Sequence, residues 1–383
     1  MALFLIPRTK VNYTFFDLLR AMFIRNSSTY VKKAELKLSE LYDNRYVRLV
    51  NSGRSALYLI LKSLPQSKVV IPAYTCPVVV EAAMAAGKTI RYVGIDKKTF
   101  ISNSFGKIDS ETIVLATYQY GYPCNISEIA KACNDVGAVL IEDAAASINT
   151  MIDGKRAGTW GDYAIISFNH SKQITVPCGG GIIISKVDIN SVINRDEIVT
   201  VTPIENRLHK RYAIISLLIT NKYFYKTYYK KFIANNDDLS SETCAKLNSN
   251  TIKEKLCNMS NWRAFLLYKQ IERLNKYTKR RKNIFDYYTK HITNPIVTKP
   301  LYVEGADYSR YVIRVNTDIR RYFCIELINN GIDVDFSHHK IASPLSFEYE
   351  HKLASEIINI PFYYKLSKRN VKYVVDKINQ INL

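Results

Sequence analysis

Short apolar runs alternate with amphipathic stretches through the first half of the chain. Leu57, Ile60, Leu61 and Leu64 lie at positions i, i+3, i+4 and i+7, which predicts a helix. The runs between such stretches are short and rich in Val and Ile, as is typical of buried strands. Strands that alternate with helices predict an α/β fold, with a mostly parallel sheet flanked by helices on both faces. The predicted strands cover residues 46–50, 69–71, 89–93, 112–116, 138–141 and 163–168.

Two stretches depart from this alternation. Residues 1–45 carry an amphipathic pattern of Phe and Leu, which predicts an N-terminal helical arm packed on the main domain or on a partner subunit. Residues 187–250 show no regular period, so we expect irregular structure there. The slightly longer segment 187–255 is interpreted as a divergent insert rich in basic and aromatic residues.

The alternation resumes in another form towards the C-terminus. A long helix is predicted from Met259 and leads to an Asn-Pro step at 294–295, where a separate unit begins. Beyond it the pattern predicts a strand at 311–315, a helix at 318–330 and a terminal helix. We therefore expect an N-terminal arm (1–45), a large domain (46–290) and a small C-terminal α+β domain (291–383).

The composition is typical of a folded protein in a reducing compartment. The chain has 383 residues, of which 47% are apolar, enough for a sizeable core. Its seven cysteines are scattered and include no CxxC pair, which argues against a disulfide framework and a zinc site. His338 and His339 have no third ligand at metal spacing, so no metal site is expected. The sequence shows no signal-peptide core and no run of 18 apolar residues, and we expect a cytoplasmic protein.

The chain is strongly basic. Its 54 Lys and Arg residues outnumber 34 Asp and Glu, and the net charge of +20 favours polyanionic partners such as nucleic acid, anionic lipid or a diphosphate-bearing small molecule. Because the charge is spread along the chain, a lysine-rich coding bias explains it equally well. The basic and aromatic stretch 207–232 leaves open a weak membrane-surface contact, a substrate-covering loop or a dimer contact. No nucleic-acid partner is expected.

Candidate chemistry gathers in residues 141–185. Asp143 ends a hydrophobic strand, and Lys172 follows in a loop, 172 − 143 = 29 residues later. A carboxylate at a strand end and a lysine in a loop can meet in one pocket. Together they suit a cofactor with a ring nitrogen at one end and an aldehyde at the other. Pyridoxal 5′-phosphate is such a cofactor.

Three other turns are predicted at the same edge of the sheet. The turn 52–55 enters a helix, where free N–H groups and the helix dipole favour a phosphate. Residues 74–76 and 119–120 follow predicted strands, as Asp143 does. Because ligands of parallel sheets bind beyond the carboxyl ends of the strands, these turns are expected to share one site.

Four stretches carry a family resemblance. They are VIPAYTCPVVVEAAMAAGKTIRYVGID (70–96), IEDAAAS (141–147), GTWGDYAIISFNHSKQITVPCGGGIIIS (158–185) and SEIINIPFYYKLSKRNVKYVVDKI (355–378). Together they resemble the DegT/DnrJ/EryC1/StrS family, the pyridoxal-phosphate aminotransferases of nucleotide-sugar biosynthesis. The third stretch keeps the Ser-Phe-x-x-x-Lys spacing of the family's lysine loop. The resemblance implies the fold type I of pyridoxal-phosphate-dependent transferases.

The resemblance also implies roles for individual residues. Lys172 would bind the cofactor covalently and move a proton during the reaction. Asp143 would pair with the ring nitrogen and keep it protonated. Ser167 would bind the phosphate together with the turn Gly53-Arg54-Ser55. A buried lysine amine is less basic than a solvated one, which agrees with the role of Lys172.

Several positions depart from the family pattern. Cys76 falls where the family has an aromatic residue that stacks on the cofactor ring, and Tyr74 is a partial substitute. Ala146 falls where a Gln or His contacts the ring oxygen, and Arg54 replaces a threonine of the phosphate turn. The family's Asn-x-Arg motif, which reaches a neighbouring subunit's site, resembles Asn261-Trp262-Arg263 only if five residues are deleted.

The resemblance implies a homodimeric aminotransferase. It would transfer an amino group from an amino acid, expected to be glutamate, to a nucleotide-linked keto sugar in polysaccharide or glycoconjugate biosynthesis. A sugar dehydratase of the same family is a second interpretation, although those relatives carry His in place of the lysine. A third is a non-catalytic or regulatory relative whose basic insert binds an anionic surface.

Overall fold

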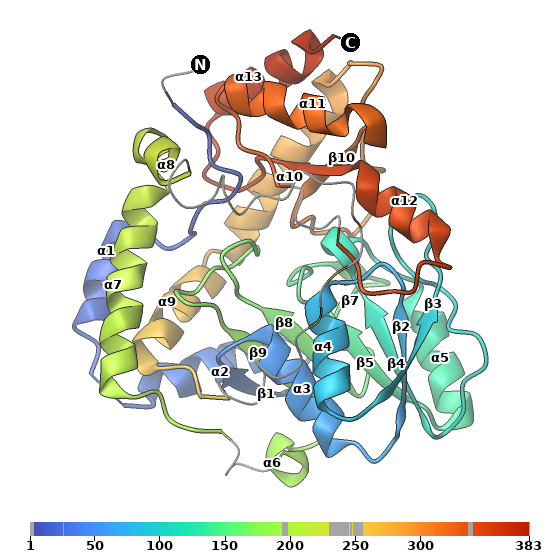
Figure 1. The fold of residues 1–383 in the computed structure, drawn as a ribbon. Helices are drawn as coiled ribbons and strands as arrows, with labels where there is room; N and C mark the ends of the chain where they lie inside the picture. The colour runs from blue at the N-terminus through green and yellow to red at the C-terminus, as the bar shows by residue number, and fades with distance from the viewer. Residues whose placement is uncertain are drawn as a thin grey trace.

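A seven-stranded sheet forms the centre of the molecule (Figure 1). The computed structural model describes residues 4–25, 27–193, 198–229, 245, 247, 256–335 and 340–382. The strand order is β1-β9-β8-β5-β4-β2-β3. Strand β9 runs antiparallel to β1 and β8, and all other pairs are parallel, which confirms the predicted mostly parallel sheet. The strands are β1 (Tyr46–Val50), β2 (Lys68–Pro72), β3 (Thr89–Val93), β4 (Thr112–Thr117), β5 (Val139–Asp143), β8 (Tyr163–Ser167) and β9 (Gly181–Ser185).

The central strands are apolar because they are buried on both faces. Every residue of β4 is buried. Val114 and Ala116 point into one core layer, and Ile113 and Leu115 point into the other. A strand covered on both faces needs a continuous apolar run rather than an alternating one.

Helices flank the sheet on both faces, as predicted. On one face, α3 and α4 share a core layer with Ile113 and Leu115. On the other face, α2, α5, α9 and α10 contribute to the layer that holds Val114. These helices are α2 (Thr29–Leu41), α3 (Gly53–Ser63), α4 (Pro77–Ala85), α5 (Ile126–Val136), α9 (Asn261–Ile271) and α10 (Leu274–His291).

A smaller unit lies above the carboxyl ends of the parallel strands, at the top of Figure 1. Its two antiparallel strands pair with each other, and three helices contribute apolar side chains to the same core cluster as these strands. The N-terminal segment also reaches this unit, because Ile6 pairs with Ile332. The elements are β10 (Tyr311–Arg314), β11 (Ile357–Ile360), α11 (Thr317–Asn329), α12 (Glu348–Glu356) and α13 (Lys368–Gln380). The predicted domain boundaries stay predictions.

The expectation of irregular structure at 187–250 was wrong for part of that segment. It contains α6 (Ile189–Val192), α7 (Pro203–Ile219) and α8 (Lys222–Tyr228). Helix α7 begins with a capping box, in which the Thr202 side chain and the Glu205 side chain each bind the other residue's backbone N–H. This start signal was present in the sequence, but the basic and aromatic composition concealed the helical period.

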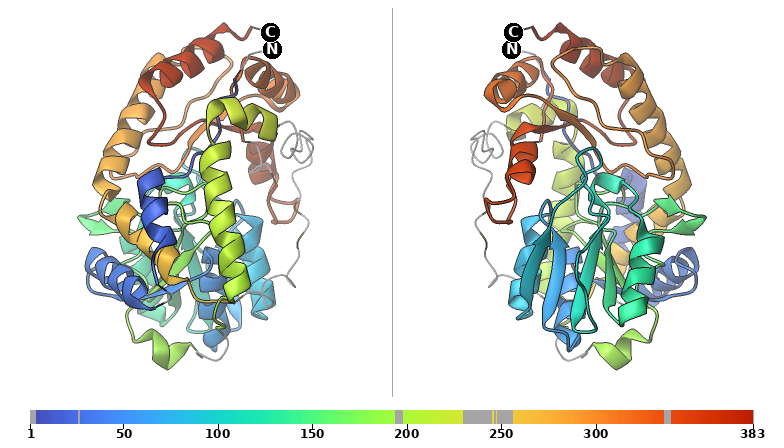
Figure 2. Two further views of the ribbon diagram at one scale, coloured as in Figure 1. Left: turned by 90° about the vertical axis from the view of Figure 1, so that its left-hand side faces the viewer. Right: turned by 90° about the vertical axis from the view of Figure 1, so that its right-hand side faces the viewer.

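Two other expectations are refined. The predicted long helix from Met259 is two helices, α9 and α10, which meet at Glu272 and Arg273. The predicted N-terminal arm contains α1 (Phe15–Met22) and α2, and it packs on its own chain. Figure 2 shows α1 beside α7, and Leu18 and Ala213 of these two helices share a small apolar cluster with Leu266 of α9. The remaining short elements are β6 (Met151–Ile152), β7 (Lys155–Arg156) and the 3₁₀ turn η1 (Gln119–Gly121).

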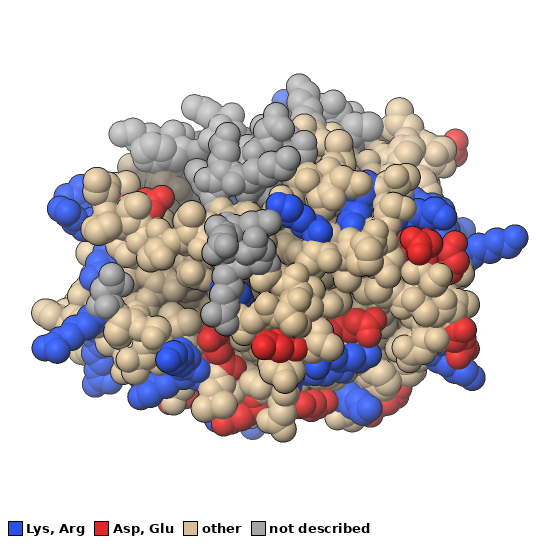
Figure 3. All heavy atoms as spheres, turned by 90° about the horizontal axis from the view of Figure 1, so that it is seen from below, with Lys and Arg blue, Asp and Glu red and all other residues tan. Residues whose placement is uncertain are grey.

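The surface charge does not form one basic patch on the face that Figure 3 shows. Basic and acidic side chains are interspersed there. No described helix is both long and apolar enough to cross a bilayer. Within the described ranges, no three His, Cys, Asp or Glu side chains gather as metal ligands, and His338 and His339 lie outside those ranges.

Candidate active site

A cavity of about 740 Å³ lies beyond the carboxyl ends of the parallel strands. Its strand-end wall brings together every site residue predicted from the sequence: Gly53, Arg54, Ser55, Cys76, Asp143, Ser167 and Lys172. Its distal wall comes from α7, α9 and the loop before β10, and it includes Leu208, His209, Arg263, Ser309 and Arg310. The turns after β1, β2, β4 and β5 therefore meet at one site, as the sheet rule predicted.

The turn at the start of α3 has the form of a phosphate site. The Ser52 side chain accepts a hydrogen bond of 3.0 Å from the N–H of Ser55 and caps the helix. Gly53 packs directly on Ser167, because a Cβ at Gly53 would lie 2.9 Å from the Cβ of Ser167. Gly181 approaches the same turn, since its Cβ would lie 2.5 Å from the nitrogen of Gly53. The helix N-terminus and the Ser167 hydroxyl thus converge on one side of the cavity.

The two acidic residues at the end of β5 have different roles. Glu142 is fully buried and accepts backbone N–H bonds of 2.7 Å from Gly158, Trp160 and Gly161. Asp143 lines the cavity instead, and it accepts a 3.1 Å bond from the N–H of Ala145. Burial raises the pKa of Asp143, although the hydrogen bond and Lys172 oppose that shift. Asp143 is therefore the carboxylate that can serve a ligand.

Lys172 lies half-buried in the loop between β8 and β9. Burial lowers the pKa of its amine, and the positive charge of Arg310 lowers it further, whereas Cys76 and Asp143 oppose the shift. A lysine with a lowered pKa has a larger fraction of neutral, nucleophilic amine near neutral pH. The cavity environment thus suits covalent chemistry at this nitrogen.

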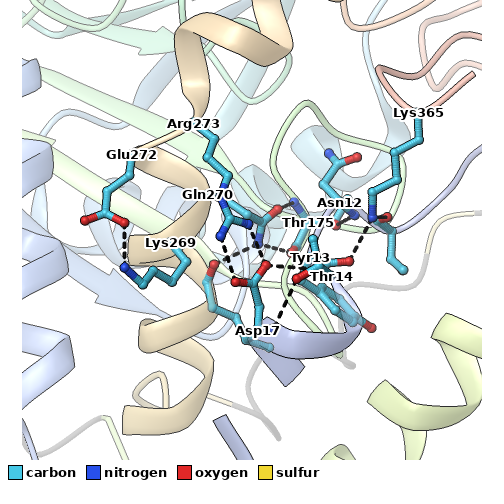
Figure 4. Close-up of polar contacts among 12 residues, drawn as sticks. Asn12, Tyr13, Thr14, Asp17, Thr175, Lys269, Gln270, Glu272, Arg273 and Lys365 are labelled. Carbon is cyan, nitrogen blue, oxygen red and sulfur yellow. Dashed lines mark hydrogen bonds and ion pairs between the residues drawn. The ribbon is translucent and has the colours of Figure 1, made fainter. Parts of the chain in front are cut away.

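Hydrogen bonds from distant segments hold the residues that follow Lys172 (Figure 4). The backbone N–H of Asn12 donates to Thr175 Oγ1 at 2.7 Å, and its side chain donates to the carbonyl of Gln173 at 2.6 Å. On the other side, Gln270 of α9 pairs with both the N–H and the carbonyl of Thr175, at 3.1 and 2.8 Å. These groups are buried, so the hydrogen bonds fix the backbone of the loop that carries Lys172.

Lys365 and Arg273 form further hydrogen bonds that secure the N-terminal segment containing Asn12. Lys365 donates to the carbonyls of Val11 and Tyr13 at 3.0 and 2.8 Å. Asp17 accepts two hydrogen bonds from Arg273, at 2.6 and 2.8 Å. Burial alone would raise the pKa of Asp17, but the bonds from Arg273 and Thr14 outweigh it and lower that pKa to about 2.

The departures from the family pattern have different outcomes. Cys76 lines the cavity at the start of α4, as expected. Tyr74 was a wrong candidate for the ring-stacking position, because it is buried in the core, where its hydroxyl bonds Tyr120 at 2.7 Å. Ala146 lines the cavity, and the side chain of Gln173 donates to its carbonyl.

The other departures from the family pattern concern Arg54 and the Asn261-Trp262-Arg263 segment. Arg54 lines the cavity, and its guanidinium lies 3.7 Å from Glu81. Arg263 lines the cavity of its own chain and donates to the carbonyl of Gly179. Asn261 instead caps the neighbouring segment, since its side chain bonds the N–H of Tyr30 at 2.7 Å.

The sequence did not predict that Arg310 lines the cavity. It also did not predict the hydrogen bonds that Asn12 and Gln270 form with the lysine loop. Arg310 lies before a strand of the smaller unit, so the rule about carboxyl ends of the main sheet did not point to it. Asn12 is an ordinary polar residue within an apolar pattern. Gln270 sits in a predicted helix, where a buried amide gives no periodic signal.

The donor set fits pyridoxal phosphate. Three features match its three ends: the α3 N-terminus with Ser167 for the phosphate, buried Asp143 for the ring nitrogen, and Lys172 for the aldehyde. The tight approach of Gly53 and Gly181 keeps backbone N–H groups open to an anion. Fold and site together define a pyridoxal-phosphate-dependent transferase of fold type I.

The family follows from comparison with known proteins. The model of the DegT/DnrJ/EryC1/StrS aminotransferase family matches residues 9–195 and 233–379, and the chain belongs to this family. It is 24% identical over 382 residues to GDP-perosamine synthase of Escherichia coli O157:H7, which covers 95% of this chain and 93% of that protein. It is 23% identical over 363 residues to a dTDP-3-amino-3,6-dideoxy-alpha-D-galactopyranose transaminase of Aneurinibacillus thermoaerophilus, with 90% and 88% covered.

A solved structure gives the same fold. The putative sugar aminotransferase Spr1654 from Streptococcus pneumoniae, in its PMP form, matches with a TM-score of 0.73 at 19% identity. The match covers 98% of this chain and 97% of that chain. The predicted family, fold type and enzyme class are confirmed.

Proposed function

We propose that the protein is a pyridoxal-phosphate-dependent aminotransferase that transfers the amino group of an amino acid, glutamate in our proposal, to a nucleotide-linked keto sugar. The observation that carries this proposal is the meeting of Lys172, Asp143 and the α3 turn in one cavity of a chain of this family. The relatives named above make amino sugars carried on GDP and dTDP, which supports a nucleotide-sugar acceptor. The product would enter polysaccharide or glycoconjugate biosynthesis.

Different residues of the strand-end wall would bind different parts of the cofactor. Gly53, Ser55 and Ser167 would bind the phosphate, with Arg54 at the edge of the turn. Asp143 would keep a proton on the ring nitrogen, because a buried carboxylate is stabilised by a cationic N–H partner. When bound, the cofactor supplies an aldehyde for covalent attachment and a ring that accepts electrons.

Lys172 supplies the amine and moves the proton. Its lowered pKa increases the neutral fraction of the amine, so Lys172 would hold the cofactor through the aldehyde and would accept a proton from the donor's α-carbon. The hydrogen bonds at Gln173 and Thr175 would keep the backbone of the lysine loop in place through both half-reactions. Cys76 lines the cavity at the position where the family has a stacking aromatic, and a thiol would hold the cofactor ring less firmly than an aromatic side chain.

The test uses Lys172→Ala with Lys186→Ala as its matched control, because Lys186 is an ion-paired surface lysine beside Asp162. The purified wild type should absorb at roughly 330–430 nm, the range of this cofactor class. Lys172→Ala should lose the lysine-bound absorbance and about 10³-fold or more of the amino transfer from glutamate. Product mass also separates an amino sugar from the dehydrated sugar of the alternative reaction. Unchanged absorbance and activity in Lys172→Ala would reject the proposal.

We also infer a homodimer, which the family resemblance implies. Large apolar side chains on the faces of α1 and α7 are exposed, and a second copy would cover them. They are Phe15, Phe16, Leu19, Phe23, Ile204, Leu208, Ile215 and Leu218. The cavity contacts of Leu208 and His209 favour a covering role for α7 over a membrane contact of 207–232, whose last residues lie outside the described ranges.

A cytoplasmic location remains our proposal. Five described cysteines, at positions 76, 124, 133, 178 and 257, have free thiols, which agrees with a reducing compartment. Sedimentation analysis gives the oligomeric state, and cell fractionation gives the location.

A further inference from the structure

We propose that a groove between α10 and α13 binds a nucleoside diphosphate, at a site separate from the active-site cavity. The two helices pack against each other in the upper part of the molecule in Figure 1. The groove between them has a volume of about 600 Å³, and none of the described residues lines both the groove and the cavity. The inference therefore goes beyond the proposed transamination and does not depend on it.

Four cationic side chains line the groove. Arg280 comes from α10, and Lys368, Arg369 and Lys372 come from the start of α13. Within the described ranges, no carboxylate lines the groove, and none of the four cations forms an ion pair. The groove thus gathers positive charge that the chain itself does not neutralise, and this charge favours an anionic ligand.

The cations of α13 lie where the helix itself disfavours them. The positive end of a helix dipole is its N-terminus, yet the first turn of α13 contains no acidic residue. Lys368 and Lys372 are four residues apart on this helix, a spacing at which like charges repel each other. A bound anion would relieve both effects, so the arrangement is more favourable with an anion present than without one.

Two side chains of the groove are already oriented. Arg280 donates from Nη2 to the carbonyl of Leu366 at 2.7 Å, which holds its guanidinium and leaves other N–H donors for an anion. The ring of Tyr287 stacks on that of His291, with the ring centroids 4.0 Å apart, and also lines the groove. A ligand would therefore meet a fixed cation and a fixed aromatic ring.

The groove is apolar between the cations. Ile284 and Val371 line it and are only 1% and 4% exposed, and Tyr287 lies beside them. A bare phosphate would leave this apolar surface uncovered. A nucleoside diphosphate would place its flat base on the apolar side chains and its phosphates among the cations, so it matches both parts of the groove.

Larger partners fit the groove less well. No described residue of α10 or α13 is a large apolar side chain exposed to solvent, so these helices offer nothing to insert into a lipid bilayer. An acidic helix of a partner protein needs apolar contacts along several turns, which Ile284 and Val371 do not supply. The volume of the groove instead lies in the range of sites for small molecules.

The experiment measures binding of GDP and of dTDP to the purified holoenzyme by calorimetry at low ionic strength. Wild type is compared with Arg369→Gln/Lys372→Gln and with Tyr287→Leu. The matched control is Lys98→Gln/Lys131→Gln, which removes the same charge from two exposed lysines that do not line the groove. Pyrophosphate is titrated in parallel, because it carries the anion without the nucleoside. Sedimentation with phosphatidylglycerol vesicles forms a separate arm.

We expect wild type to bind at least one of the two nucleotides in the groove, whether or not the cavity binds another. Arg369→Gln/Lys372→Gln should weaken that binding by roughly tenfold or more, since it removes charge-assisted hydrogen bonds, whereas the control should match wild type. Tyr287→Leu should weaken the nucleotide more than pyrophosphate, and wild type should bind pyrophosphate less tightly than the nucleotide.

Three results would overturn the inference. The first is nucleotide binding that is absent from wild type or equal in wild type and Arg369→Gln/Lys372→Gln. The second is pyrophosphate binding as tight as that of the nucleotide, which would reduce the groove to a site for simple anions. The third is vesicle binding that this variant loses while its nucleotide binding is unchanged, which would assign the groove to a lipid surface.

Discussion

The two walls of the cavity are built in different ways. The strand-end wall consists of turns that follow neighbouring strands, so the sheet itself brings Asp143, Ser167 and the α3 turn together. The distal wall consists of segments from α7, α9 and the smaller unit, and in the described ranges none of these segments is a strand of the seven-stranded sheet. Individual hydrogen bonds hold them there, such as that from Gln173 to Asp307.

Under the proposed function, this difference would separate cofactor binding from substrate recognition. The strand-end wall contains the groups that fit the cofactor, and its geometry follows from strand order. The distal wall contains Arg263 and Arg310, and its position depends on a few side chains. Variation in the distal wall can therefore change the substrate while the cofactor site is kept.

The largest expected effect comes from breaking the support of the distal wall. Asp307 and Arg281 form an ion pair of 2.6 Å in which both side chains are at most 4% exposed. Asp307→Leu leaves a buried guanidinium without its carboxylate, which should lower the free energy of unfolding by about 3–5 kcal/mol. Chemical denaturation followed by circular dichroism measures this change.

Two further variants interpret that result. The double variant Asp307→Leu/Arg281→Met should recover most of the loss, because no buried charge is left unpaired. Glu272→Gln removes the exposed pair of Lys269 and Glu272 and should cost at most about 0.5 kcal/mol. If Asp307→Leu is as stable as Glu272→Gln, the distal wall does not depend on this ion pair.

A smaller effect is expected from crowding the strand-end wall. In Gly53→Ala the new Cβ would lie 2.9 Å from the Cβ of Ser167, so the phosphate turn must shift. We expect a stability loss of about 1–3 kcal/mol and roughly tenfold weaker cofactor binding, measured by absorbance titration. Gly94→Ala is the control, since its Cβ would meet only Glu350 at 3.4 Å. Tight cofactor binding by Gly53→Ala would show that the turn is looser than the structure indicates.

The smallest expected effect is a pH dependence of stability at Lys365, which binds the N-terminal segment. Burial lowers the pKa of Lys365 from 10.5 to about 8, and the nearby Lys10 adds to the shift. Below pH 8 the lysine is charged in both states, and burying that charge is unfavourable. Between pH 8 and 10.5 the folded protein has released the proton and the unfolded chain has not, so stability rises with pH.

Lys365→Gln keeps two N–H donors for the carbonyls of Val11 and Tyr13 but does not titrate. Relative to this variant, the wild type should gain about 1–2 kcal/mol between pH 7.5 and 10, less than a fully buried lysine would gain. Urea denaturation at several pH values measures the difference. A difference that stays constant with pH would contradict a lowered pKa at Lys365.

The sequence predicted the sheet and the strand-end wall well, for physical reasons. Apolar runs such as TIVLAT at 112–117 identify strands buried on both faces, and polar residues after such runs must lie at one edge. Helix α7 was missed because its exposed apolar residues and basic residues hide the period of its buried face. Tyr74 was misplaced because the strand pattern does not say which way a side chain turns after the strand ends.

The distal wall could not be predicted in the same way. The bond from Gln173 to Asp307 joins residues 134 positions apart, and that from Thr175 to Gln270 joins residues 95 apart. No period or spacing in a single sequence records such contacts. The family resemblance did not supply them either, since Arg310 lies outside the four stretches that carried it.

The hydrogen bonds that hold the lysine loop also imply an order in which parts of the protein fold during translation. A nascent chain that has left the ribosome as far as residue 250 contains all seven strands of the central sheet. It still lacks Gln270, Asp307 and Lys365, which hold the lysine loop and the N-terminal segment. Since domains fold as the chain emerges, the sheet can form before the loop is fixed. Lys172 would then reach its working position only after the last segments of the chain have been translated and docked.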